Sequence, residues 1–148
     1  MSFKIRINYG YGIRLSDIFP IPPARLRSFV CNHHFLQQAL LTWLGGRKKI
    51  KDMDYDDFED FGHSLSSAGI ASILAELIEY EEHVVFAPCM DFNGKYYLIY
   101  PPAYPWEMSA YDKKFITQAE IERIIRKYVS WFTDEEIEFD YQSVESGG

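Results

Sequence analysis

The chain has 148 residues and a mass of 17.4 kDa, which is the size of a single globular domain. Hydrophobic residues make up 47% and aromatic residues 17% of the sequence, enough apolar surface to exclude intrinsic disorder outside the ends. No apolar run is long enough to span a bilayer, and residues 1–6 lack the apolar region and cleavage site typical of a secretory leader. Two cysteines are too few for a disulfide framework. We therefore expect a cytoplasmic protein without membrane contact.

The net charge of −7 is distributed unevenly along the chain. Residues 1–51 contain nine Lys or Arg side chains and one acid, Asp17, whereas residues 52–148 contain six basic and 21 acidic side chains. High affinity for duplex DNA rests on clustered Lys and Arg that release counterions from phosphates. The overall acidity therefore disfavours a dedicated duplex-DNA binder and favours a partner with a basic surface.

The N-terminal residues predict a β-hairpin followed by a long helix. Apolar and basic residues alternate over residues 3–7, and the pattern resumes over 13–15, so residues 8–12 are expected to form a turn. A helix is predicted from about residue 23, because proline favours the first turn. Apolar residues then recur every three or four positions until glycines 45–46 supply the stop.

Two further helices are predicted in the middle of the chain. Tyr55, Phe58 and Phe61 are spaced by three, which favours a short amphipathic helix that docks its rings and leaves its carboxylates in water. A second helix is expected after Ser64 or Ser66, either of which could cap it, with an apolar stripe in the sequence that follows.

A second hairpin, a last helix and a last strand complete the prediction. The dipeptide Asn93-Gly94 favours a two-residue type I′ turn between flanking strands. Thr117 and Glu120 have the spacing of a capping box, so a helix is expected to begin there. Residues 137–141 alternate as a half-buried strand, and residues 143–148 are expected to fray.

These elements predict a single acidic α+β domain over residues 1–148. A largely antiparallel sheet, made of two hairpins and a C-terminal strand, is expected to pack against three to four helices.

The patterns that metal binding or cofactor binding requires are incomplete. Cys31 and His34 share a helix face, but no second close pair exists to complete a tetrahedral zinc site. Residues 52–56 resemble the start of a calcium loop, yet Asp57 and His63 stand where glycine and glutamate are needed. Phosphate-binding glycine loops and nucleophile elbows are also missing. We expect no metal and no cofactor.

The acidic, aromatic run between residues 52 and 61 is the strongest functional candidate. Such a run can bind a basic groove through charge while an aromatic side chain anchors the contact, although a solvated helix face over docked rings would look the same. Carboxylates between residues 134 and 140 have the same sign, and the two runs could together imitate the phosphates of nucleic acid if they converge. The candidate partner-binding residues are Asp54, Tyr55, Asp56, Asp57, Glu59 and Asp60.

The favoured interpretation is a non-catalytic module that binds a basic protein. One version is an inhibitor or immunity-type protein that acts as a nucleic-acid mimic and blocks a nucleic-acid-processing enzyme such as a nuclease. The other version is an adaptor.

Two alternatives belong to other functional classes. A thiol-dependent enzyme would use Cys31 or Cys89, and labelling of the thiols would test it. Direct nucleic-acid binding would use the basic N-terminal hairpin and helix, with Tyr9 or Tyr11 stacking on bases. Its phosphate contacts would come from Arg6, Arg14, Arg25, Arg27, Arg47, Lys48, Lys49 and Lys51.

Overall fold

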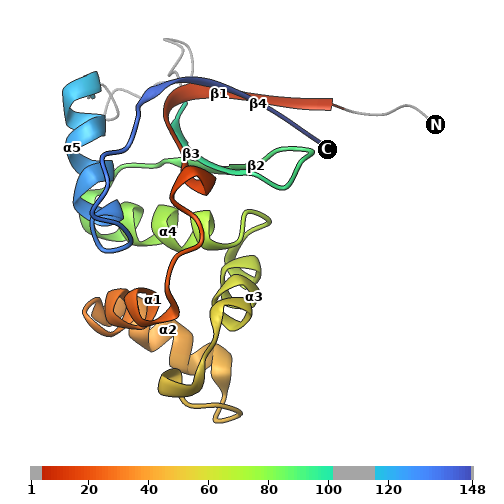
Figure 1. Cartoon of the computed structure of the whole chain (residues 1–148), viewed down its shortest axis with the longest axis vertical. Helices are drawn as coiled ribbons and strands as arrows, with labels where there is room; N and C mark the ends of the chain where they lie inside the picture. The colour runs from red at the N-terminus through yellow and green to blue at the C-terminus, as the bar shows by residue number, and fades with distance from the viewer. Residues whose placement is uncertain (1–4, 102–115, 148) are drawn as a thin grey trace.

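The computed structural model describes residues 5–101 and 116–147 and has an α+β architecture, as predicted (Figure 1). Its antiparallel sheet has the strand order β2-β3-β1-β4. The strands are β1 (Ile5–Arg14), β2 (Ala87–Met90), β3 (Tyr96–Tyr100) and β4 (Asp140–Gly147). The helices are α1 (Pro23–Cys31), α2 (His34–Leu44), α3 (Tyr55–Leu65), α4 (Ile70–Glu82) and α5 (Gln118–Val129), with short 3-10 turns η1 (Leu15–Ile18) and η2 (Ile50–Asp52).

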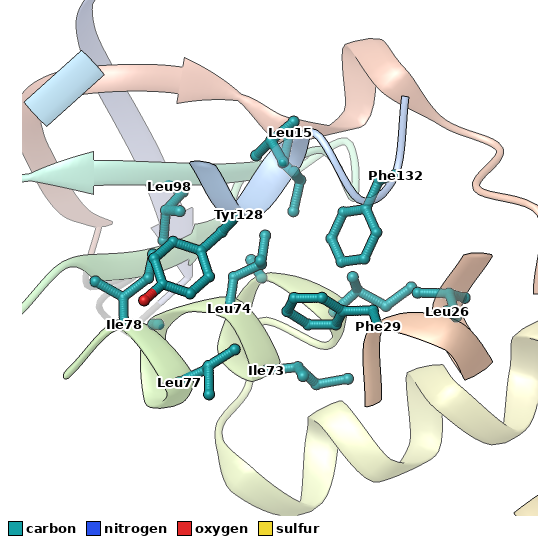
Figure 2. Packing of buried hydrophobic residues seen from close by; sticks show 14 of the residues in the cluster. Leu15, Leu26, Phe29, Ile73, Leu74, Leu77, Ile78, Leu98, Tyr128 and Phe132 are labelled. Atoms are coloured by element: carbon teal, nitrogen blue, oxygen red, sulfur yellow. The ribbon is translucent and has the colours of Figure 1, made fainter. Parts of the chain in front are cut away.

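Helix α4 lies between the sheet and the layer formed by α1, α2 and α3 (Figure 1). It is apolar on almost every side, and its residues from Ile70 to Ala75 are all buried. Figure 2 shows side chains of α1, α4, α5 and β3 meeting in one core. The labelled core residues are Leu15, Leu26, Phe29, Ile73, Leu74, Leu77, Ile78, Leu98, Tyr128 and Phe132. Within the described ranges, no helix is by itself long and apolar enough to cross a membrane.

The predicted N-terminal hairpin is wrong, because residues 5–14 form one strand. The first part of β1 pairs with β4, from Ile5 to Gly12, and its last part also pairs with β3. A Cβ atom on Gly10 would collide with the carbonyl oxygen of Tyr100, and one on Gly12 would collide with that of Leu98. The glycines that suggested a turn are therefore needed for the close approach of two strands.

The long helix predicted from residue 23 to residue 44 is divided into α1 and α2, which explains why residues 5–101 and 116–147 contain five α-helices instead of three or four. The Asn32 side chain donates to the carbonyl of Ser28 at 2.7 Å, and His33 Nδ1 lies 2.6 Å from the carbonyl of Phe29. These side chains occupy carbonyls of the preceding turn, and such local contacts compete with helix propagation.

The predicted cap of the next helix at Ser64 or Ser66 is also wrong. Helix α3 continues to Leu65, and α4 begins after Gly69, whose φ of 53° is strained for other residues.

The second hairpin is confirmed, but its turn is longer than predicted. The amide of Asp91 donates to the carbonyl of Lys95, and the amide of Gly94 donates to the carbonyl of Asp91. Only Gly94, with φ of 75°, has positive φ in this loop, whereas a type I′ turn requires it at two positions. The Asp91 carboxylate accepts the amides of Asn93 and Lys95, which favours the wider loop.

The C-terminal residues that were expected to fray belong to β4. This strand begins at Asp140, three residues later than predicted, and pairs with β1 as far as Gly147. Its Val144 is buried in a small cluster with Cys89 and Ile99, separate from the main core. Burial of that single valine and the ladder with β1 hold this end of the chain in place.

The replacement Gly12→Ala tests the close approach of β1 and β3. We expect the added methyl group to lower the free energy of unfolding by about 1–3 kcal/mol, as overpacking does elsewhere. Urea denaturation measures this, with Ser143→Ala at an exposed position of β4 as the control. An unchanged unfolding midpoint for Gly12→Ala would contradict this account of the strand.

Candidate functional site

The acidic run begins with the structural N-terminus of α3. The Asp54 side chain accepts the amide of Asp57 at 2.9 Å, and the Asp57 side chain accepts the amide of Asp54 at 2.9 Å. This reciprocal pair is a capping box, and the spacing of the two aspartates was its signal in the sequence. Lys48 also donates to Asp57 at 2.7 Å, and together these contacts lower the pKa of the Asp57 carboxyl. Two of the predicted binding residues therefore have structural partners.

Glu59 faces the protein and joins α3 to β3. Its carboxylate accepts the hydroxyl of Tyr96 on β3 at 2.7 Å and that of Tyr55 at 3.3 Å, and His63 lies 3.4 Å away. The Glu59 side chain is only 15% exposed. Burial and the neighbouring carboxylate raise the pKa of both tyrosines. The Tyr55 ring meets Phe19 edge-on, so Tyr55 is a packing residue as much as a surface anchor.

Three of the six predicted residues remain exposed: Asp54 at the N-cap of α3, and Asp56 and Asp60 within the helix. The loop that leads to them exposes Arg47, Lys48, Lys49 and Lys51. The surface around α3 is therefore of mixed charge, and Lys48 already pairs with Asp57.

The second acidic segment, residues 133–140, follows α5 and leads into β4. Burial alternates along it: Ile137 and Phe139 are partly buried against the core, whereas Glu136, Glu138 and Asp140 are exposed. Arg126 lies over the ring of Phe139, with its guanidinium carbon 4.8 Å from the centroid. In Figure 1, α3 and this segment lie on either side of the connection through residues 15–22. The connection therefore separates the two acidic runs in the view of Figure 1.

Hollows flank the second acidic segment on both sides. One lies between the segment and the end of α5, beside Arg126 and Ser130. Three others share Asp17 and form a groove between η1 and the segment. We call this the η1 groove. Its walls include Arg14, Asp17, Ile18, Phe19, Arg25, Phe132, Asp134, Glu135, Glu136, Ile137, Glu138 and Asp140. The sequence showed the charges but gave no sign that these segments meet.

Most basic side chains near these surfaces already have partners within the chain. Arg14 donates to Asp17 at 2.6 Å, and Arg25 donates to Asp134 at 2.7 Å. Arg27 donates to the carbonyl of Met53 at 3.0 Å. These contacts join the basic third of the sequence to acids and carbonyls elsewhere. The side chain of Arg6 lies outside the described residues.

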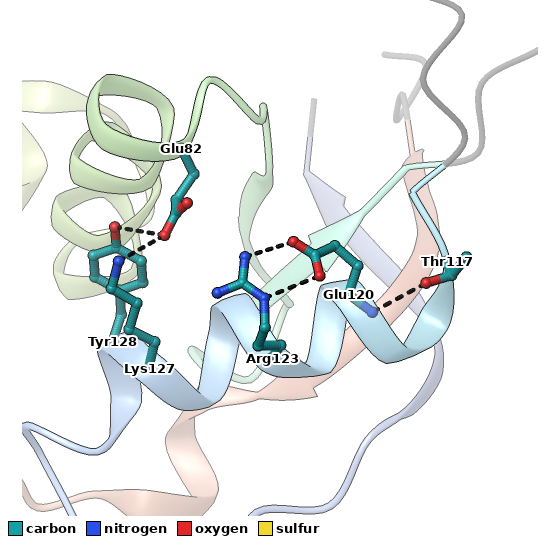
Figure 3. Close-up of polar contacts among 6 residues, drawn as sticks. All are labelled: Glu82, Thr117, Glu120, Arg123, Lys127 and Tyr128. Atoms are coloured by element: carbon teal, nitrogen blue, oxygen red, sulfur yellow. Dashed lines mark hydrogen bonds and ion pairs between the residues drawn. The ribbon is translucent and has the colours of Figure 1, made fainter.

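The cations of α5 are engaged in the same way (Figure 3). Arg123 donates to Glu120, at 2.9 Å for Nε, and Lys127 donates to Glu82 at the end of α4 at 2.9 Å. Tyr128 also donates to Glu82, and these donors lower the pKa of that carboxyl. At the start of α5, the side chain of Thr117 accepts the amide of Glu120, which confirms the predicted start of this helix.

The two thiols lie in different surroundings. Cys89 is buried, and burial raises its pKa to about 11, so it is almost entirely protonated at neutral pH. Cys31 is exposed at the end of α1. Across residues 5–101 and 116–147, no three His, Cys, Asp or Glu side chains are grouped to hold a metal ion.

No protein-family model, curated protein or solved structure matches this chain.

The pair Asp57→Ala and Asp56→Ala separates the capping box from the exposed carboxylate beside it. We expect Asp57→Ala to lower the free energy of unfolding by about 1 kcal/mol and Asp56→Ala to change it by less than about 0.5 kcal/mol. The pKa of Asp57 is lowered by folding, so its ionised form stabilises the fold at neutral pH, and this contribution is lost as the pH falls below about 4. Urea denaturation between pH 7 and pH 3 should therefore show a smaller acid loss for Asp57→Ala than for Asp56→Ala. Equal pH profiles would count against the assignment.

The pair Glu59→Gln and Asp60→Asn tests which carboxylate faces the protein. The two tyrosine hydroxyls donate to different oxygens of Glu59, and glutamine replaces one of these oxygens with an amide nitrogen, so one hydroxyl loses its acceptor and we expect Glu59→Gln to cost about 1–3 kcal/mol of stability. Asp60 is exposed, and Asp60→Asn should have little effect. Thermal unfolding measures both, and a stable Glu59→Gln protein would show that the hydroxyl contacts are dispensable.

Proposed function

We propose that this protein is a cytoplasmic, non-catalytic module that binds a basic protein through exposed carboxylates. The observation that supports this proposal is the unequal use of charge within the chain. Arg14, Arg25 and Lys48 pair with carboxylates, whereas Asp56, Asp60 and Glu138 are exposed acids without an ion pair in the described part of the chain. Lys49 and Lys51 are also exposed without an ion pair in the described part of the chain, but unpaired acids outnumber unpaired bases there, so the net charge left over for a partner is negative and attracts cationic surfaces.

The same observation weighs against nucleic acid as the partner. A phosphate-binding surface needs several cations on one face that are available to replace counterions. Residues 5–14 form one strand, so the basic hairpin on which this alternative relied is replaced by a ladder with β3 and β4. Its Arg14 is engaged with Asp17.

The second acidic segment supports the inhibitor version of the proposal. Glu136, Glu138 and Asp140 are exposed at alternate positions, and alternate residues of an extended chain are separated by about 6.6 Å. A nucleic-acid strand likewise presents single negative charges at regular intervals along an extended backbone. An enzyme that binds such a strand through Lys and Arg is therefore a suitable class of partner, and the module would block its substrate channel.

The test is capture of a partner from nuclease-treated lysate by the tagged protein and by two double variants. The α3 variant is Asp56→Asn with Asp60→Asn, and the segment variant is Glu136→Gln with Glu138→Gln. Asp57 and Glu59 are kept, because changes there would weaken the fold. We expect one basic protein in near-stoichiometric amount, lost in at least one double variant and weakened by raising the salt from 0.05 to about 0.5 M.

The matched control is Glu79→Gln with Glu145→Gln, which removes two exposed charges from α4 and β4. It should retain the captured protein. Capture that survives both double variants and high salt would contradict the proposal, as would binding of a single-stranded oligonucleotide with similar affinity.

A further inference from the structure

The η1 groove opens where two paired strands separate. The ladder between β1 and β4 ends at Gly12 and Asp140, although β1 continues to Arg14. Ile13 and Arg14 pair with β3 on the other side. The chain before Asp140 leaves the sheet, and the space between it and η1 becomes the groove.

The lining of the η1 groove combines apolar side chains, which we call its floor, with charged side chains, which we call its rim. The apolar wall includes Ile18, Phe19, Pro20, Phe132 and Ile137. The rim has six carboxylates and two guanidinium groups, so its charge is negative. These charged residues are Asp17, Asp134, Glu135, Glu136, Glu138, Asp140, Arg14 and Arg25.

The main chain along this groove is open to further hydrogen bonds. Glu136, Ile137 and Glu138 belong to no helix or strand, and their backbone groups make no hydrogen bond to any part of the chain that the structure describes. Exposed backbone groups next to the end of a ladder can accept an added strand. Alternate burial over residues 136–140 gives this segment the periodicity of a strand.

We propose that the η1 groove binds an extended segment of the basic partner, in which Lys or Arg alternates with apolar residues. Its backbone pairs with residues 136–138, its apolar side chains cover the floor and its cations meet the rim. This inference rests on the proposed function and names the mode of binding.

The ion pairs at the groove are exposed, so cations of a partner can reach their carboxylates. The side chains of Arg14 and Asp17 are 48% and 54% exposed, and that of Asp134 is 87% exposed. Exposed pairs contribute about 0–1 kcal/mol, so cations of a partner can replace the arginines at little cost. The rim carboxylates are spread along the groove and do not converge on one point, which suits a row of cations better than a single metal ion.

The test uses a fluorescein-labelled peptide of eight residues that alternates Arg and Val, with anisotropy as the readout. A second peptide of the same sequence carries N-methyl groups on its valines, which keeps the charge and removes backbone donors. We expect the methylated peptide to bind about tenfold more weakly, equivalent to about 1.4 kcal/mol. The Glu136→Gln, Glu138→Gln variant should also bind the unmethylated peptide about tenfold more weakly.

Two variants with substitutions outside the groove serve as controls. The Glu79→Gln, Glu145→Gln protein and the Asp56→Asn, Asp60→Asn protein should bind within about twofold of the wild type, because neither touches the groove. Equal weakening by the α3 and segment variants, or equal binding of both peptides, would overturn the groove while leaving an acidic binding surface. Failure of the peptide to bind, with a captured partner that depends on Asp56 and Asp60 alone, would also overturn it. If both double variants still capture the partner, the proposed function itself is overturned.

Discussion

The close approach of β1 to β3 is the constraint on which the rest of the molecule depends. Gly10 and Gly12 allow the backbone of β1 to approach the carbonyls of β3, so one strand can pair with β4 along its first part and with β3 along its last. This arrangement places α4 and α5 against one side of the sheet (Figure 1). It also decides where the ladder with β4 ends, and the η1 groove begins at that point.

Charge in this protein acts in two distinct ways. Some carboxylates stabilise the fold: Asp57 completes a helix cap, Glu59 receives two tyrosine hydroxyls, and Glu82 holds Lys127. Others are exposed and make no such contact. Acids outnumber Lys and Arg in the sequence, so pairing between its basic and acidic parts leaves an excess of unpaired carboxylates. Arg14 and Arg25 lie beside residues 134–140, so the surface there is less negative than the sequence of that region alone suggests, although it remains acidic.

Local patterns could be predicted from the sequence, and contacts between distant residues could not. The rings at spacing three identified α3, and Thr117 identified the start of α5, because both signals lie within one helical turn. Gly10 and Gly12 suggested a turn. Their role in strand packing could not be predicted, because the carbonyls that require them come from residues almost ninety positions later. For the site, the six candidate residues were visible as a charged run. The inward orientation of Glu59 depends on Tyr96, and no feature of the run itself indicates it.

Some acids at α3 stabilise the fold and others do not, and this difference affects how the sequence can change over time. Positions 54, 57 and 59 each serve the fold, so drift there is restricted whatever the protein binds. Positions 56 and 60 are exposed and make no such contact, so other residues can replace these acids as a partner changes. Distant relatives would therefore keep the pattern Asp-x-x-Asp-x-Glu together with a tyrosine at the position of Tyr96, while their total acidity varies. Conservation is therefore expected at the acids that hydrogen-bond within the fold, and variation at the exposed acids that do not.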